Sequence, residues 1–134
     1  QKKSIDSGMA FEKFEEMVSN QDGMIKKAGE LNAPIFSKEI TSKKDGYLKS
    51  FDTRAVGWAA VEMGCGRKIK SDKLDNTAGI KFNAKVGDYI EKGDRIMSCF
   101  NSDNHKLNDA HSKLIKTFQL SDEKVKSPDL IYQD

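Results

Sequence analysis

The sequence contains no apolar run that approaches the roughly 20 residues needed to cross a membrane, and no signal-peptide pattern is visible in it. Its only two cysteines, Cys65 and Cys99, stand 34 positions apart and form no C-x-x-C motif. Two isolated thiols in a chain of this length are typical of a reducing compartment and not of a disulfide scaffold. We therefore expect a cytoplasmic protein without a membrane partner.

Arginine and histidine are also scarce. Only three of the 23 basic residues are arginine, and 21 acidic residues reduce the net charge to +2. Lysine and acidic residues are interspersed along every segment, whereas nucleic-acid readers gather arginine on one face, so we expect no nucleic-acid partner. His105 and His111 lie six positions apart, about 240° around a helix, which is not the spacing of a metal-binding pair. We expect no metal site.

What the chain does have is enough material for one domain, because 134 residues, 37% of them hydrophobic, bury a core without metals or disulfides. We therefore predict a single domain over residues 1–134. Apolar periodicity predicts helices over residues 7–20, 52–63 and 103–120, with a further helical turn over residues 24–31. Alternating patterns predict strands within residues 35–51 (two strands around a turn at 43–46), 80–86, 95–100 and 130–132. Strands and helices mix without strict alternation, which predicts an α+β fold.

Local signals define several of these element ends. Ser7 and Asp52 are the expected N-caps of the first two long helices, and Gly64 is the natural end of the second. Two Gly-Asp pairs, at residues 87–88 and 93–94, predict a pair of tight turns around one buried residue, Ile90.

The strongest candidate for chemistry is the run Gly64-Cys65-Gly66-Arg67-Lys68, because glycines beside basic residues can surround a phosphate. These glycines follow a helix instead of preceding one, so the helix dipole at this end is negative. The cations then have a structural role at the helix end, while a flexible basic loop that meets a phosphate held elsewhere is the functional alternative. Four aspartates, Asp72, Asp75, Asp88 and Asp94, fall in predicted turns, where Asp commonly bonds its own backbone. No Ser-His-Asp or Cys-His set can be assembled.

Three blocks of sequence, over residues 7–18, 52–79 and 87–94, together resemble the C-terminal region of thymidine and pyrimidine-nucleoside phosphorylases. The first reads Ser-Gly-Met-Ala-Phe-Glu-Lys-Phe and continues to Met-Val. The second reads Asp-Thr-Arg-Ala at its start, ends its helix in Met-Gly-Cys-Gly-Arg, and then has Ser-Asp and a glycine. The third is similar to the two-turn hammerhead of that family. The chain departs from the family at Cys65, where Ala or Gly is usual, and at residues 76–78, where Asn-Thr-Ala replaces a more typical Tyr-Ser-Val.

The resemblance implies an α/β-hammerhead with a mixed, mainly antiparallel sheet flanked by helices. It implies a pentosyltransferase that moves 2-deoxyribose from thymidine to phosphate and releases thymine, acting as a homodimer. The co-substrate is phosphate and no cofactor is implied. In the family the catalytic residues lie upstream of this segment, so none is assigned here, the chain is expected to be part of a longer polypeptide, and alone it is expected to be inactive. The expected contribution of this domain is a lid loop over the active-site cleft, with the candidates Gly64, Gly66, Arg67, Lys68 and Lys70.

A second interpretation comes from another functional class. The hammerhead is related in part to biotinyl and lipoyl carriers, which place a modifiable lysine in a short turn between two strands. The nearest approach here is Lys92, within Glu-Lys-Gly, which lacks the Met-Lys or Asp-Lys neighbours of a carrier. A non-enzymatic carrier-like or interaction module therefore remains the alternative.

Overall fold

The computed structural model describes residues 2–25 and 33–129, which divide into two units, Gln1–Ala33 and Pro34–Asp134. The expected helical turn over residues 24–31 lies largely outside the described residues, and the expected edge strand over residues 130–132 lies entirely outside them. No helix in the described parts is long and apolar enough to span a membrane.

The described residues of the first unit form two helices, α1 (Lys2–Asp6) and α2 (Met9–Ser19). The sequence predicts Ser7 as the N-cap of the second helix, but Gly8 holds that position with a left-handed φ of 81°, and the residues before Ser7 form α1. The Ser7 hydroxyl instead donates to the carbonyl oxygen of Ser4 at 3.4 Å. The amphipathic pattern of α2 is present, and Phe14 and Met17 on its apolar stripe are about half exposed within this unit.

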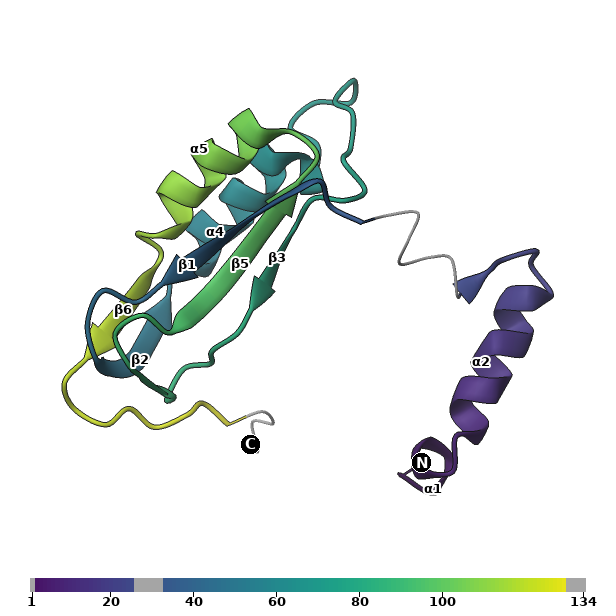
Figure 1. The fold of residues 1–134 in the computed structure, drawn as a ribbon, viewed down its shortest axis with the longest axis horizontal. Helices are drawn as coiled ribbons and strands as arrows, with labels where there is room; N and C mark the ends of the chain where they lie inside the picture. Colours follow the sequence, from purple (N-terminus) through teal and green to yellow (C-terminus); the bar gives the residue numbers. More distant parts are fainter. Residues whose placement is uncertain (1, 26–32, 130–134) are drawn as a thin grey trace. The chain divides into compact units, whose positions relative to one another are not determined.

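Over residues 34–129, the second unit is an α+β assembly of two three-stranded antiparallel sheets and two α-helices (Figure 1). One sheet has the strand order β1-β5-β3, with β1 Phe36–Thr41, β5 Arg95–Asn101 and β3 Gly79–Phe82. The other has the order β4-β2-β6, with β4 Tyr89–Ile90, β2 Gly46–Phe51 and β6 Phe118–Ser121. Helix α4 (Thr53–Ala60) packs beside α5 (Asn104–Leu114), and α5 packs against β1 and β5. The α+β prediction is confirmed, whereas the hammerhead topology stays a prediction.

The core lies between the helices and the strands and is apolar. Its fully buried members include Leu48 of β2, Met97 of β5 and Leu107 of α5. Helix α4 begins as predicted, because the Asp52 carboxylate accepts a hydrogen bond from the backbone N–H of Ala55 at 2.9 Å.

Strands β1 and β2 are present where the sequence predicts them, but the turn between them does not make a hairpin. β1 pairs with β5 from Phe36↔Asn101 to Thr41↔Arg95, and β2 pairs with β4 and β6. The turn therefore carries the chain from one sheet to the other.

The two Gly-Asp turns are confirmed, and they join the sheets. Gly87 and Gly93 have left-handed φ values of 97° and 98°, and Ile90 between them is buried. The following aspartates close the turns by accepting hydrogen bonds from the backbone N–H groups of Lys85 and Glu91, each at 2.8 Å. The first turn also bonds to the backbone of β2 and the second to that of Ser42, beyond the end of β1, so the double turn fixes one sheet against the other.

Two predicted elements have wrong ends. The strand predicted over residues 80–86 stops at Phe82, because Lys85 already belongs to the first Gly-Asp turn. The helix predicted over residues 103–120 ends at Leu114, and Phe118 reaches the core from β6 instead. Thr117 interrupts the helix: its hydroxyl donates to the carbonyl oxygen of Leu114 at 2.8 Å, and its own carbonyl accepts from the N–H of Asp52 at 2.6 Å.

The end of α5 offers a matched test of this packing. Leu114 is fully buried, whereas the next residue, Ile115, is 39% exposed. We expect Leu114→Ala to lower the free energy of unfolding by about 2–5 kcal/mol, because it leaves a cavity in the core, and Ile115→Ala to lower it by less than about 1 kcal/mol. Guanidinium unfolding of the 134-residue chain measures both, and equal losses would contradict the assignment of Leu114 to the core.

Candidate functional site

The candidate site is loop 64–75, which follows α4 and projects beyond the ends of the helices and strands of the second unit (Figure 1). The last turn of α4 widens into a π-helical turn, η1 (Val61–Cys65). Within it Gly64 is buried and has a left-handed φ of 97°, a backbone conformation that favours glycine. The carbonyl oxygen of Gly64 accepts a hydrogen bond from the N–H of Asp75 at 3.0 Å, so the two ends of the loop meet.

The Asp75 carboxylate binds four hydrogen-bond donors at the base of the loop. One oxygen accepts from the backbone N–H and the hydroxyl of Thr77, at 2.9 and 2.7 Å. The other accepts from the N–H and hydroxyl of Ser102, 27 positions away, also at 2.9 and 2.7 Å. Burial on its own would raise the pKa of Asp75, but the donors from Ser102 and Thr77 outweigh it and hold the pKa far below its ordinary value. The group is therefore a carboxylate at every physiological pH, suited to structure and not to proton transfer.

A buried amide lies beneath this carboxylate. Asn101, at the end of β5, is fully buried, and its side-chain NH₂ donates to the carbonyl oxygen of Met63. Its side-chain oxygen accepts from the N–H of Asp103 at 2.6 Å. Asp103 in turn caps α5 by accepting from the N–H groups of His105 and Lys106. The end of α4, the end of the loop and the start of α5 meet at this point. We call this region the junction and define it by Met63, Gly64, Asp75, Asn101, Ser102 and Asp103.

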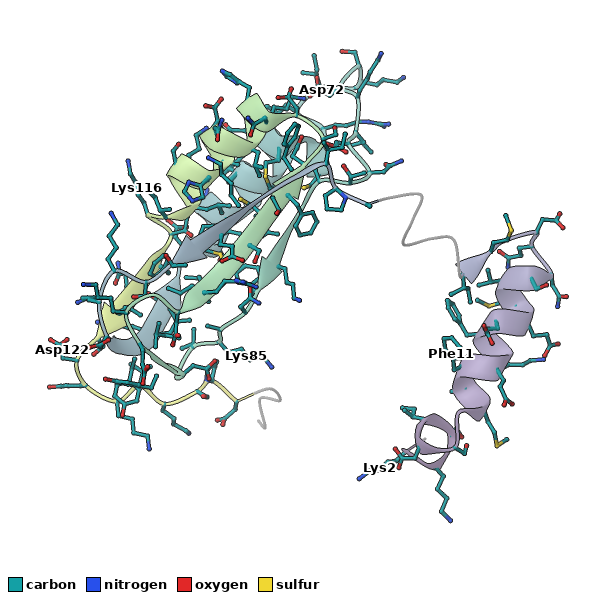
Figure 2. The ribbon with its side chains drawn as sticks, viewed as in Figure 1. Lys2, Phe11, Asp72, Lys85, Lys116 and Asp122 are labelled. Carbon is teal, nitrogen blue, oxygen red and sulfur yellow. The ribbon has the colours of Figure 1, made fainter. Side chains whose placement is uncertain are left out.

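The tip of the loop is ordered by Asp72, which is labelled in Figure 2. Its carboxylate accepts from the N–H groups of Lys68 and Ile69 at 2.8 and 3.1 Å. The Asp72 N–H donates back to the carbonyl oxygen of Ile69 at 3.1 Å. The hydrogen bonds from Ile69 and Lys68 lower the pKa of Asp72. The tip therefore has a defined turn, and Ile69 is 62% exposed on it.

One candidate cation is already engaged. Lys68 donates to a carboxylate oxygen of Glu62 at 3.2 Å, and the other oxygen of Glu62 binds Lys113 of α5. These hydrogen bonds, from Lys113 and then Lys68, lower the pKa of Glu62. Lys68 thus links the loop to η1 through a specific ion pair with Glu62. The sequence alone predicts only the general role of a cation near the negative end of the helix dipole.

The five candidates therefore separate into two groups. Gly64 is part of the junction, Gly66 lies so close to Val61 that an added Cβ would stand 3.0 Å from its Cγ2, and Lys68 is held by Glu62. Arg67 and Lys70 are exposed, and within the described residues neither forms an ion pair. Those two side chains are the ones available to a ligand.

Sequence reasoning placed Asp72 and Asp75 in turns, which is confirmed, but missed the bond from Asp75 to Ser102 and the role of Asn101. The local signal of an Asp two residues before a Thr was visible. The partner 27 positions later was not, because no periodicity connects the two segments.

The remaining candidates do not assemble into a site. His105 is exposed near Asp109, and His111 lies on another side of α5, where its Nε2 is 3.2 Å from the carbonyl oxygen of Glu39. Across residues 2–25 and 33–129, no group of three or more His, Cys, Asp or Glu side chains is placed to hold a metal ion. Lys92 is exposed in the second Gly-Asp turn, where its backbone N–H donates to Asp45 at 2.7 Å.

Comparison with known proteins gives a consistent result. The family model of the pyrimidine nucleoside phosphorylase C-terminal domain matches residues 47–121, a segment that contains loop 64–75 and the whole junction. A pyrimidine-nucleoside phosphorylase of Staphylococcus aureus (strain bovine RF122 / ET3-1) is 33% identical over 133 residues, which cover 97% of this chain and 30% of that protein. The Staphylococcus epidermidis (strain ATCC 12228) protein with that name is 31% identical and that of Staphylococcus aureus (strain USA300) 32%, with the same coverage. The chain thus spans about 30% of the length of these relatives.

The two thiols, each next to or near a junction residue, provide a test of which side chains are exposed in this region. Cys65 is exposed beside Gly64, and Cys99 is buried in β5. Burial and the nearby Asp75 raise the pKa of Cys65, and burial raises that of Cys99. In the native chain at neutral pH we expect a disulfide reagent such as DTNB to modify one thiol slowly, and both in guanidinium. Cys65→Ser should remove the native reaction, and reaction of Cys99 in the folded chain would contradict the structure.

Proposed function

The chain belongs to the pyrimidine-nucleoside phosphorylase family, whose C-terminal domain it contains, and from this premise we propose that it forms the lid of a thymidine phosphorylase. In this proposal the complete protein transfers 2-deoxyribose from thymidine to phosphate and releases thymine. The family match over residues 47–121 supports the phosphorylase class. The exposed loop with a fixed base supports the lid.

Loop 64–75 has the properties that a lid needs. Its base is held by the junction, its tip has a defined turn, and Arg67 and Lys70 on it are exposed. Closure of such a loop removes water from a cleft, and in phosphorolysis this matters because water competes with phosphate as the nucleophile at the sugar carbon. Cationic side chains on the closing face also stabilise an anionic co-substrate.

The groups that bind phosphate and the departing base are assigned to the part of the polypeptide outside this chain. Within the described residues, the one carboxylate with a strongly lowered pKa, Asp75, is fully occupied by donors and so is not available as an acid or base for the transfer. The proposal includes a homodimeric, cytoplasmic complete protein that requires phosphate and no cofactor.

The carrier alternative is less well supported. Lys92 is in a tight turn between two strands, as a carrier lysine would be, but β4 and β5 belong to different sheets and do not pair with each other. The turn joins the two sheets instead of forming the end of a hairpin. The family match also points to the phosphorylase.

The lid proposal predicts a defect when the exposed cation is removed. In the complete protein we expect Arg67→Ala to lower kcat/KM for phosphorolysis by about tenfold or more, equivalent to about 1.4 kcal/mol of transition-state stabilisation. Lys49→Ala, which removes an exposed cation from β2, is the matched control and should retain the parental rate. Unchanged turnover and substrate affinity in Arg67→Ala would refute the lid function of this residue.

The proposal also predicts what the isolated chain does. With thymidine and phosphate, the 134-residue chain should release no free base above the protein-free rate, while the complete protein does. Comparison of kcat/KM for thymidine and uridine in the complete protein then measures the proposed preference. Release of thymine by the isolated chain would show that the catalytic groups lie within these 134 residues, contrary to the proposal.

A further inference from the structure

Asp75 belongs to loop 64–75, but its side chain binds outside the loop. One carboxylate oxygen is occupied by Thr77, which follows the loop, and the other by Ser102, which precedes the N-cap of α5. Its backbone N–H closes the loop on Gly64 at the same time. A single residue therefore connects the end of the loop to the end of α4 and to the start of α5.

No other contact of the loop within the described residues does the same. Asp72 bonds only to the backbone of the tip, and Lys68 reaches Glu62 through an ion pair on the surface. Exposed ion pairs contribute little to holding a loop in one conformation. The four bonds of Asp75 are charge-assisted, and the two from Thr77 are partly buried, so together they are the stronger restraint.

We propose that Asp75 is the positioning residue of the lid, which holds loop 64–75 against the start of α5, so that the loop presents Arg67 and Lys70 in one backbone conformation. This inference rests on the lid function proposed above. The lowered pKa of Asp75 agrees with it, because the same donors that lower the pKa are those that hold the loop. The side chain acts through the loop and is not itself expected to touch substrate.

The arrangement of donors makes Asp75→Asn an informative change. Both oxygens of the carboxylate face N–H and O–H donors, two on each side. An amide of the same size has one oxygen and one NH₂ group, so on either the Thr77 side or the Ser102 side its NH₂ opposes a backbone N–H, and the hydroxyl there must turn from donor to acceptor. Asp94→Asn is the control, because the Asp94 carboxylate also accepts from a backbone N–H, that of Glu91, but lies in the second Gly-Asp turn.

The experiment combines limited trypsin digestion with kinetics in the complete protein. Trypsin cleaves after Arg67, Lys68, Lys70 and Lys73 of the loop, and mass spectrometry quantifies these cuts separately from all others. We expect Asp75→Asn to increase the rate of the loop cuts by about tenfold, equivalent to about 1.4 kcal/mol in the free energy of local opening. We also expect kcat/KM to fall by a larger factor than KM rises, so that kcat itself is lower. Asp94→Asn should leave the loop cuts and the kinetics at parental values.

The outcomes separate this inference from the function on which it rests. Faster loop cuts with lower kcat/KM support both. Faster loop cuts with parental kinetics support positioning of the loop by Asp75 but overturn the lid function. Loop cuts at the parental rate overturn the inference about Asp75, whatever the kinetics show.

Milder variants keep the test decisive if Asp75→Asn does not fold. Thr77→Val removes one hydroxyl donor and retains the backbone N–H, whereas Thr77→Ser retains both donors to Asp75. We expect loop cuts about threefold faster in Thr77→Val and parental in Thr77→Ser. Equal cleavage of the two variants would overturn the inference as well.

Discussion

The carboxylate of Asp75, with four donors around its two oxygens, is the constraint on which the candidate site depends. It brings together three segments that are far apart in the sequence: the π-helical end of α4, the end of loop 64–75 and the start of α5. The buried side chain of Asn101 also connects distant segments, since its amide bonds to both Met63 and Asp103. A buried polar network of this kind is stabilising only when every member is satisfied, and among the described residues no buried side-chain polar atom lacks a partner.

Much of the fold could be predicted because the signals that define it are local. Asp52 as an N-cap, the apolar period of α4, Gly64 at its end and the two Gly-Asp turns all depend on neighbours within a few positions. The errors have a common cause. Phe118 lies four positions after Leu114 and so continues the helical period, yet it belongs to a strand whose partner, β2, lies almost 70 positions earlier. The pairing of β1 with β5, and not with β2, is likewise decided by residues far along the chain.

The candidate site shows the same limit. Gly64, Gly66 and the basic residues after them are visible as a local motif, and the structure separates those that hold the loop from Arg67 and Lys70, which face solvent. Ser102 and Asn101 carry no motif of their own, so their role emerges only when β5 and α5 are placed beside the end of α4. The resemblance to pyrimidine-nucleoside phosphorylases supplies what neither periodicity nor geometry contains, namely the reason to propose that the reacting groups belong to another part of a longer polypeptide.

Successive strands along the chain belong to different sheets, and this alternation has a consequence for how the segment can be divided. Strand β1 is completed by β5 and strand β2 by β6, so neither half of residues 34–134 contains a finished sheet. Division of the segment between β2 and β3 would leave strands of both sheets without their partners in each of the two pieces. Residues 34–129 therefore form one indivisible folding unit, from which loop 64–75 extends without contributing a strand to either sheet.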